Sequence, residues 1–377
     1  MMRRLGILLL TVSAFALPVL LAELALRLSG HADYVPVMFV PDPWTVWRLK
    51  PNANERVVRS GYFDYRWTSS AQQFRGGHEY PSSAPPDRLR ILSVGDSFTF
   101  GVGVNDPDTY PARLEEFLAR RCAHDLEVIN AGVGGFGTSH ALALFEHYGN
   151  RLEPDLVILG LLTSDRIDDA RADLYEVRGD TVVPVAGASD RFWGRVRLTE
   201  LWVYQGLVQH SAFANWLQQR VAAAQAALTA PQRFEAPADS SEVTHGSAPQ
   251  DVDWLLTQKL LRRMRDTIHS AGARLLVVVI PFGSELESRV NRDGKETAAI
   301  ERMMVVCGEL GIPCVDFSTW FAESYPRDAA RDLYIEGEGH MTALGYARLA
   351  ESVADRITKT DMVPCRALAA DESGADR

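Results

Sequence analysis

The segment Leu89-Arg-Ile-Leu-Ser-Val-Gly-Asp-Ser-Phe-Thr-Phe-Gly101 is the most informative stretch of this chain. Its first half, 89–94, is a mostly apolar run of strand length that ends at Gly95. Ser97 therefore stands where a strand ends and a helix can begin, at the carboxyl edge where open α/β sheets bind ligands. We expect Ser97 to be exposed there. The alternative is an ordinary turn in which Asp96 and Ser97 only cap a helix.

The rest of the chain repeats this alternation of strands and helices. Further apolar runs of strand length cover 126–131, 156–161, 274–280 and 312–317, and helical patterns cover 110–121, 139–150 and 252–271. Continuous apolar strands separated by helices predict a parallel sheet with helices on both faces. The sequence therefore predicts an α/β domain with about five parallel strands over residues 86–360.

Composition and charge exclude several classes of protein. The chain has 377 residues, 46% of them apolar and 23% charged, which is typical of a folded soluble-type domain. Its net charge of −10 argues against a general nucleic-acid binder, which needs a basic surface for the phosphates. Four cysteines without a C-x-x-C pair do not form a disulfide scaffold or a zinc knuckle.

The first 29 residues differ from the remainder. Arg3 and Arg4 precede Leu5–Ala22, a stretch of eighteen residues without a charge. Such a run is just long enough to span a bilayer, and the leading arginines place the N-terminus in the cytoplasm. We expect residues 1–29 to be an uncleaved transmembrane anchor of the cytoplasmic membrane, with the remaining chain on the periplasmic or extracellular side. A cleaved secretory signal is the alternative. The cysteines would then meet an oxidising compartment, in which both a disulfide and buried free thiols are open possibilities.

Three segments flank or interrupt the predicted domain: a lead-in at 30–85, an insertion at 176–250 and a polar tail at 361–377. Within the insertion we expect a helix at about 196–228, followed by a Pro/Ala/Ser-rich loop. The insertion is rich in aromatic residues, which either bury its helix or form a lid or sugar-stacking wall over a site: Trp193, Trp202, Tyr204, Phe213 and Trp216.

Three further motifs follow later strands. Gly132, Gly134 and Gly137 satisfy G-x-G-x-x-G, but a dinucleotide site requires this motif after the first strand and an acid at the end of the next one. Asp155 begins a strand, so we prefer a loop that presents backbone N–H groups to an oxyanion. Ser164-Asp165 ends the third strand, and Glu338-Gly-His340 precedes the last helix. His140 and His147 lack a third ligand at a suitable spacing, so we expect no metal and no cofactor.

Together these blocks resemble the SGNH/GDSL hydrolase superfamily in its membrane-anchored bacterial branch. The resemblance rests on Gly95–Gly101, Ile129–Gly135, Pro154–Leu159 with Ser164-Asp165, and Glu338–His340 with Thr342–Gly345; the lead-in Phe74-Arg75-Gly76 is also similar. It covers about 70–360 and implies a three-layer α/β/α flavodoxin-like fold and ester chemistry.

The resemblance also implies roles for individual residues. Ser97 is the nucleophile, His340 its general base, and the N–H groups of Ser97 and Gly135 are oxyanion donors. Ser164, beside Asp165, stands where the family has an asparagine donor, and Gly337 stands where it often has an aspartate. Glu338 remains able to orient His340.

These residues predict a serine esterase that acts on acyl esters, such as O-acetyl groups of envelope or exported polysaccharide. A polysaccharide O-acetyltransferase is one alternative, because it uses the same acyl-enzyme and excludes water. A weakened domain that only binds glycan or a protein partner is the other.

Overall fold

A computed structural model describes residues 2–30, 33–85, 88–122, 125–188, 206–207, 211–229, 249–291, 297–360 and 362–363. Most of the expected tail and much of the insertion, including Trp193, Trp202 and Tyr204, lie outside these residues.

A five-stranded parallel sheet forms the centre of the molecule. Its strands are β5 (Arg88–Gly95), β6 (Asp125–Gly132), β7 (Leu156–Leu162), β10 (Arg274–Ile280) and β11 (Cys314–Asp316), in the spatial order β11-β10-β7-β5-β6. In chain order this is the 2-1-3-4-5 arrangement of flavodoxin-like folds, whose switch point lies between the first and third strands. The switch point here lies between β5 and β7, so residues that follow these two strands meet at one edge of the sheet.

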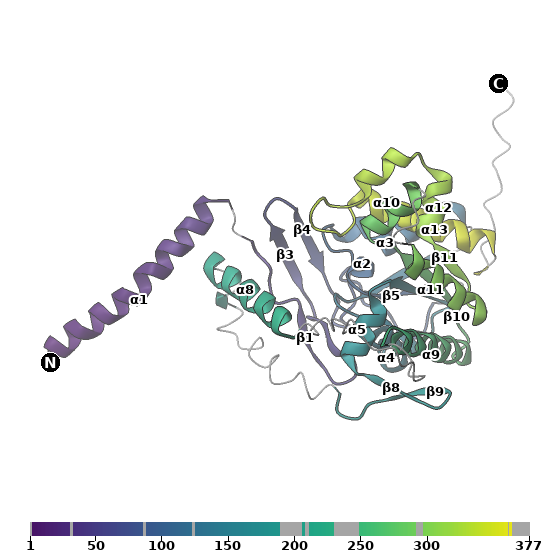
Figure 1. Ribbon diagram of the computed structural model, residues 1–377, viewed down its shortest axis with the longest axis horizontal. Coiled ribbons are helices and arrows are strands. Elements are labelled where there is room, and N and C mark those ends of the chain that lie inside the picture. Colours follow the sequence, from purple (N-terminus) through teal and green to yellow (C-terminus); the bar gives the residue numbers. More distant parts are fainter. Residues whose placement is uncertain are drawn as a thin grey trace, which may run out of the picture.

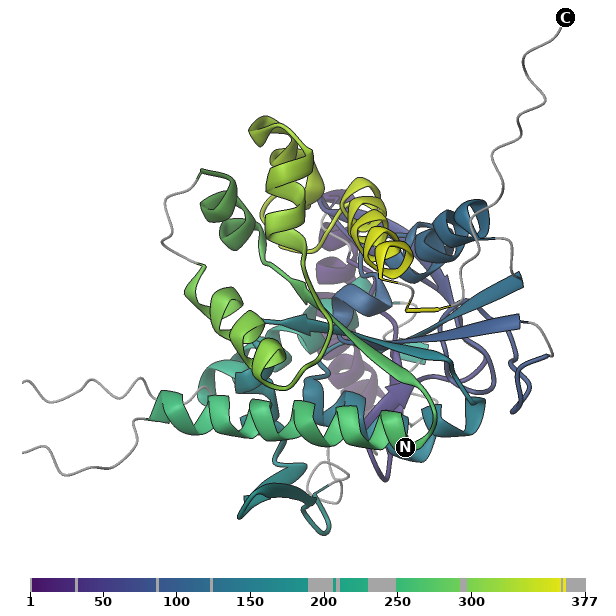
Figure 2. The same cartoon turned by 90° about the vertical axis from the view of Figure 1, so that its right-hand side faces the viewer.

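Helices cover both faces of the sheet (Figure 2). One layer contains α4 (Thr138–His147), α5 (Asp165–Ala172), α9 (Pro249–Ser270) and α11 (Ala298–Glu309); the other contains α3 (Tyr110–Arg121), α10 (Gly283–Asn291), α12 (Phe317–Ser324) and α13 (Ala343–Lys359). Alternate strand residues face each layer: along β7, Val157 and Leu159 join one core, whereas Leu156 and Ile158 join the other. This explains why the strands are apolar throughout.

The expected strands and helices are confirmed, with one shortened strand. The apolar run 312–317 yields only β11, because Phe317 already begins α12 and Asp316 accepts a hydrogen bond from Thr319 N at 3.2 Å as its N-cap. Met362 and Val363, just after residue 360, are also buried in the core that contains α13.

The lead-in segment forms two antiparallel hairpins rather than a plain connection. They are β1 (Phe39–Asp42) with β2 (Val46–Leu49), and β3 (Asn54–Arg59) with β4 (Phe63–Thr68). Figure 1 shows β3 and β4 against one side of the α/β body. Leu49 and Trp67 of these hairpins are fully buried in the core that also contains α4.

The insertion contains a third hairpin, β8 (Tyr175–Arg178) with β9 (Thr181–Pro184), which the sequence patterns did not predict. Its helix α8 covers Ala212–Thr229, and residues 196–205 at the start of the expected helix lie outside the described residues. Phe213 and Trp216 of this helix stack on each other with ring centroids 6.0 Å apart.

Helix α1 (Met2–Leu28) extends away from the body of the molecule (Figure 1). Glu23 near its end accepts hydrogen bonds from Ala212 N at 3.0 Å and Phe213 N at 2.8 Å, which connects α1 to the start of α8. We expected a membrane span at 1–29. Among the residues that the structure describes, no helix combines the length and the apolar character needed to cross a membrane.

Candidate active site

The predicted nucleophile lies on a sharp turn between β5 and the short helix α2 (Ser97–Phe100). Asp96 caps this helix, because its Oδ1 accepts a hydrogen bond from Phe98 N at 2.9 Å. Ser97 is half-buried, whereas every other residue from Ile91 to Phe100 is buried. The capping interpretation of the motif is therefore right for Asp96, and Ser97 is the one partly exposed residue of this turn.

A hydrogen-bonded chain connects Ser97 to His340 and Glu338. His340 Nε2 lies 2.9 Å from Ser97 Oγ, and His340 Nδ1 lies 2.8 Å and 3.0 Å from the two carboxylate oxygens of Glu338. A carboxylate only accepts, so Nδ1 carries the ring proton and Nε2 is free to accept the proton of Ser97. This is the arrangement of a nucleophile, a general base and an orienting acid.

The loop before α13 determines which residue supplies the acid. Gly337, at the position where the resembled family often has aspartate, has φ +73°, a left-handed conformation that favours glycine. The loop closes through a hydrogen bond from Ile335 N to His340 O at 2.8 Å, and Glu338 Oε2 also accepts from His340 N at 3.0 Å. This tight loop brings the carboxylate of Glu338, two residues before His340, to the imidazole.

The Glu338 carboxylate is well suited to remain charged. Its side chain is only 4% exposed, and burial by itself would raise its pKa. Hydrogen bonds from His340 and the charge of Arg59, whose Nη1 lies 3.5 Å away, outweigh burial and lower the pKa below the usual value. The acid therefore stays ionised at neutral pH, and its negative charge lies where it would stabilise a protonated His340 ring.

The loop after β6 lies directly against the nucleophile turn. Gly95 and Gly132 are partners in the sheet register, and Val133 N donates to Gly95 O at 3.0 Å. A Cβ at Gly132 would lie 2.2 Å from Phe100 N, so only glycine permits this approach. Among the described residues, neither the Ser97 N–H nor the Gly135 N–H donates to another group. These are the two N–H groups that the resemblance implies as oxyanion donors.

Ser164 and Asp165 follow β7, the strand beside β5. Ser164 is half-buried and precedes α5 without capping it through its side chain. Asp165 is 2% exposed, and its Oδ2 accepts from Leu162 N at 3.2 Å. Burial, followed by the nearby Asp96 carboxyl, raises the pKa of Asp165 well above its usual value. The sequence singled out Asp165 with Ser164 as an oxyanion or substrate-binding candidate, and the structure places its buried carboxyl directly after β7.

Several residues near the site were not singled out as site residues from the sequence. Arg75 is buried, and its guanidinium donates to the carbonyls of Phe100, Gly101 and Val104 just after the nucleophile. Its motif was part of the resemblance, but without a role. Trp47 and Arg59 come from the hairpins, and no sequence signal identified them. In the described part of the chain, no group of three or more His, Cys, Asp or Glu side chains could hold a metal.

The fold is thus of the flavodoxin type, with a serine, a histidine and a glutamate joined at the carboxyl edge of its sheet. A model of the GDSL-like lipase/acylhydrolase family matches residues 93–348, more than half of the chain, so the chain belongs to this family of hydrolases. The SGNH/GDSL resemblance is thereby confirmed.

Solved structures of similar proteins include the lipase/acylhydrolase from Enterococcus faecalis, with 14% identity and a TM-score of 0.41 over 75% of this chain and 100% of that one. Axe2, an acetylxylan esterase from Geobacillus stearothermophilus, has 13% identity and a TM-score of 0.38 over 71% of this chain and 94% of its own. No curated protein matches the chain.

Proposed function

We propose that this chain is a serine ester hydrolase with Ser97 as nucleophile. The observation that carries this proposal is the continuous chain from Ser97 Oγ through the His340 imidazole to Glu338, with 2.9 Å and 2.8 Å links. His340 Nε2 takes the hydroxyl proton while Ser97 Oγ bonds to the acyl carbon of the ester. The carbonyl oxygen becomes an oxyanion between the N–H groups of Ser97 and Gly135.

The first half ends when His340 gives its proton to the leaving alcohol and the acyl group remains on Ser97. The second half uses the same groups. Water then attacks the acyl carbon and gives one proton to His340, which passes it to Ser97 Oγ as the acyl–oxygen bond breaks; the carboxylic acid leaves, and the serine hydroxyl and neutral imidazole are restored. Glu338 does not exchange a proton in either half; it stabilises the imidazolium.

The substrate class that we favour is a small acyl ester of a carbohydrate, such as an O-acetyl sugar. Tyr62 supports this choice: it is 42% exposed, and its ring lies 3.4 Å from the position of a Cβ at Gly337, beside the loop that carries His340. Exposed aromatic rings offer a flat apolar surface next to a polar edge.

We also propose that the catalytic domain lies outside the cytoplasm. The charge pattern of the first 29 residues supports this, and so does Cys122, which is disulfide-bonded. Cell fractionation combined with protease treatment of intact spheroplasts tests this location. Protection of the domain in intact spheroplasts would exclude it.

The test of the activity is labelling with a fluorophosphonate probe, together with hydrolysis of p-nitrophenyl acetate. We expect the wild-type chain to be labelled and active, and Ser97→Ala to lose both properties while keeping its melting temperature. Ser270→Ala, at an exposed serine on α9, is the matched control and should behave as wild type. Labelling of Ser97→Ala would refute the assignment, and product analysis with an added acceptor sugar separates hydrolysis from acyl transfer.

A further inference from the structure

The loop 133–137, which carries the oxyanion donor Gly135, is held at three points. Val133 N donates to Gly95 O, and Gly137 N donates to His140 Nδ1 at 3.2 Å. The middle point comes from the lead-in hairpin: Trp47 Nε1 donates to Gly134 O at 3.1 Å, across 87 residues of sequence.

The Trp47 bond acts on the same peptide group as the proposed oxyanion donor. Gly134 C=O and Gly135 N–H belong to one peptide plane, and no described peptide bond is cis. In a trans peptide these two groups point in opposite directions. Because the indole binds the carbonyl, the Gly135 N–H points away from Trp47.

The Gly134–Gly135 peptide plane can be held in one orientation only by contacts from other parts of the chain. It joins two glycines, and Gly135 has φ +79°, so neither side chain restricts rotation of the plane. Among the described residues, the Gly135 N–H makes no hydrogen bond that would hold it. The carbonyl of Gly134 is therefore the point at which the orientation of this N–H can be controlled.

The contacts of the Trp47 ring hold the indole in place, so that it can fix the orientation of the Gly134–Gly135 peptide. The ring centroid of Trp47 lies 5.9 Å from that of Phe136, in the loop 133–137, and 5.0 Å from that of His140, in α4. Its hairpin is also attached to the other end of α4, because Asp42 accepts a hydrogen bond from the Tyr148 hydroxyl. Both ends of α4 thus contact the β1–β2 hairpin.

We propose that Trp47 is a positioning residue for catalysis, whose indole N–H orients the Gly134–Gly135 peptide so that the Gly135 N–H faces the oxyanion. This inference rests on the proposed function of Ser97. Ser164 gives it additional weight, since a serine in place of an amide donor leaves the oxyanion more dependent on the backbone N–H groups.

The test removes the indole N–H and keeps the ring. In Trp47→Phe we expect kcat for p-nitrophenyl acetate to fall about tenfold to a hundredfold, because one donor loses its orientation. KM should stay within about twofold, since the bond acts on the transition state. Binding of an alkyl boronic acid, which forms a tetrahedral adduct with Ser97, should weaken by the same factor as kcat/KM.

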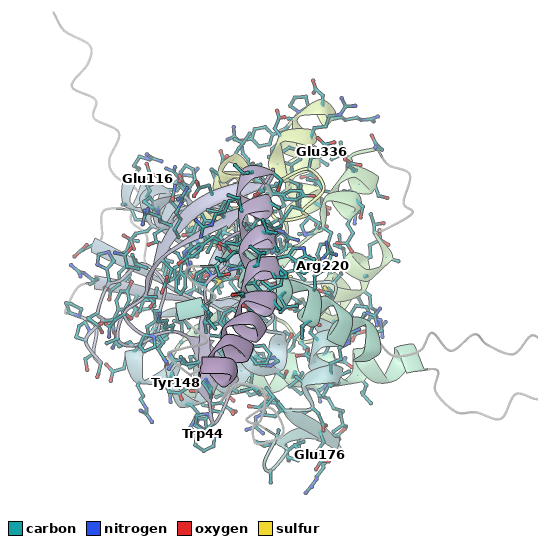
Figure 3. All side chains as sticks on the ribbon, turned by 90° about the vertical axis from the view of Figure 1, so that its left-hand side faces the viewer. Trp44, Glu116, Tyr148, Glu176, Arg220 and Glu336 are labelled. Carbon is teal, nitrogen blue, oxygen red and sulfur yellow. The ribbon has the colours of Figure 1, made fainter. Side chains whose placement is uncertain are left out.

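Trp44→Phe is the matched control. Trp44 lies at the turn of the same hairpin, is 51% exposed and stacks on His147 at 3.8 Å. Figure 3 shows it at the opposite end of the molecule from Glu336, which lies on the His340 loop. This variant should keep the wild-type kcat. If Trp47→Phe does not fold, benzothienylalanine at position 47 removes the same N–H with almost no change in shape.

The outcomes are distinct. An unchanged kcat in a folded Trp47→Phe or benzothienylalanine variant overturns the positioning role while the esterase assignment stands. A drop in kcat that boronic acid affinity does not follow also overturns it, because it indicates a structural effect elsewhere. An inactive, unlabelled wild-type chain refutes the proposed function itself.

Discussion

Glu338 and His340 are separated by a single glycine, yet the carboxylate of Glu338 reaches back to His340 Nδ1 at 2.8 Å and to the His340 backbone N–H at 3.0 Å. One side chain thus fixes both the ring and the backbone of the proposed base. The acid sits one residue later than in the resembled family, and the left-handed Gly337 makes this shift possible.

We predict that the acid contributes less to catalysis than the base. His340→Ala should lower kcat by about four orders of magnitude or more, because the Ser97 proton then has no acceptor. Glu338→Gln should lower kcat by roughly tenfold to a thousandfold, because Gln binds the ring but no longer stabilises the imidazolium. Steady-state kinetics with a simple acetyl ester measures both effects.

Glu336→Gln is the control for this comparison, since Glu336 is exposed on the same loop (Figure 3). It should leave kcat unchanged. Wild-type activity in Glu338→Gln would mean that the site works as a Ser–His dyad or takes its acid from another residue.

We predict that Ser164→Asn increases the rate of ester hydrolysis. An amide reaches further than a hydroxyl and presents two N–H donors, so it would add a donor to the oxyanion. We expect kcat to rise by up to about a hundredfold with little change in KM. Kinetics on a variant with a wild-type melting curve provides the measurement.

The companion variant Ser164→Ala shows whether the hydroxyl already contributes. If it is not a donor, kcat should be unchanged. A lower kcat in well-folded Ser164→Asn would reject the missing-donor explanation and indicate a pocket that is closed around the smaller residue.

We predict that His140 makes the fold sensitive to acid. Gly137 N donates to His140 Nδ1, and burial lowers the pKa of this imidazole from 6.5 to about 3. The unfolded chain takes up the proton near pH 6.5 and the folded chain does not, so this stabilisation is complete above pH 6.5 and is lost as the pH falls toward 3. The slope from this one group is at most about 1.4 kcal/mol per pH unit.

Urea unfolding between pH 7 and pH 4 tests the sign of this effect. His140→Gln should show a flatter dependence of the unfolding free energy on pH over this range. His269→Gln, at an exposed histidine near the end of α9, is the control and should follow the wild-type curve. Equal slopes for His140→Gln and wild type would contradict the prediction.

We predict that Arg75 raises the free energy of unfolding through its hydrogen bonds to the segment that follows Ser97. Its Nη2 donates to Val104 O at 2.6 Å, and its Nε pairs with Asp106 at 2.8 Å. Arg75→Met leaves buried carbonyls without donors, at a cost of about 3 kcal/mol in unfolding free energy. Chemical denaturation measures this cost, and Arg66→Met at an exposed arginine of β4 should cost less than about 0.5 kcal/mol. A similar small loss for both variants would show that Arg75 is dispensable.

Much of the fold follows from local patterns. The runs ending at Gly95, at Gly132 and near Leu162 are strands because buried parallel strands are apolar on both faces, and the structure confirms them. Local patterns fail where one apolar residue fits two elements. Phe317 extends the apolar run of β11, but it belongs to α12, because the Asp316 cap starts a helix there.

The residues of the candidate site also stand out through local patterns. A serine directly after the first strand, a histidine before the last helix and an acid two residues from that histidine are all local features of the sequence. The sequence by itself, through motifs that resemble the family, therefore predicted Ser97, His340 and Glu338 as the candidate site residues.

Only the tertiary structure decided how these residues are supported. The strand order places β7 beside β5, so that Ser164 and the nucleophile turn share one edge of the sheet. Trp47 reaches Gly134 across 87 residues, and Arg75 reaches the end of α2 from the lead-in. Such contacts depend on the packing of hairpins against the α/β body. Periodicity reports only the burial of a residue within its own element, so it does not reveal these long-range partners.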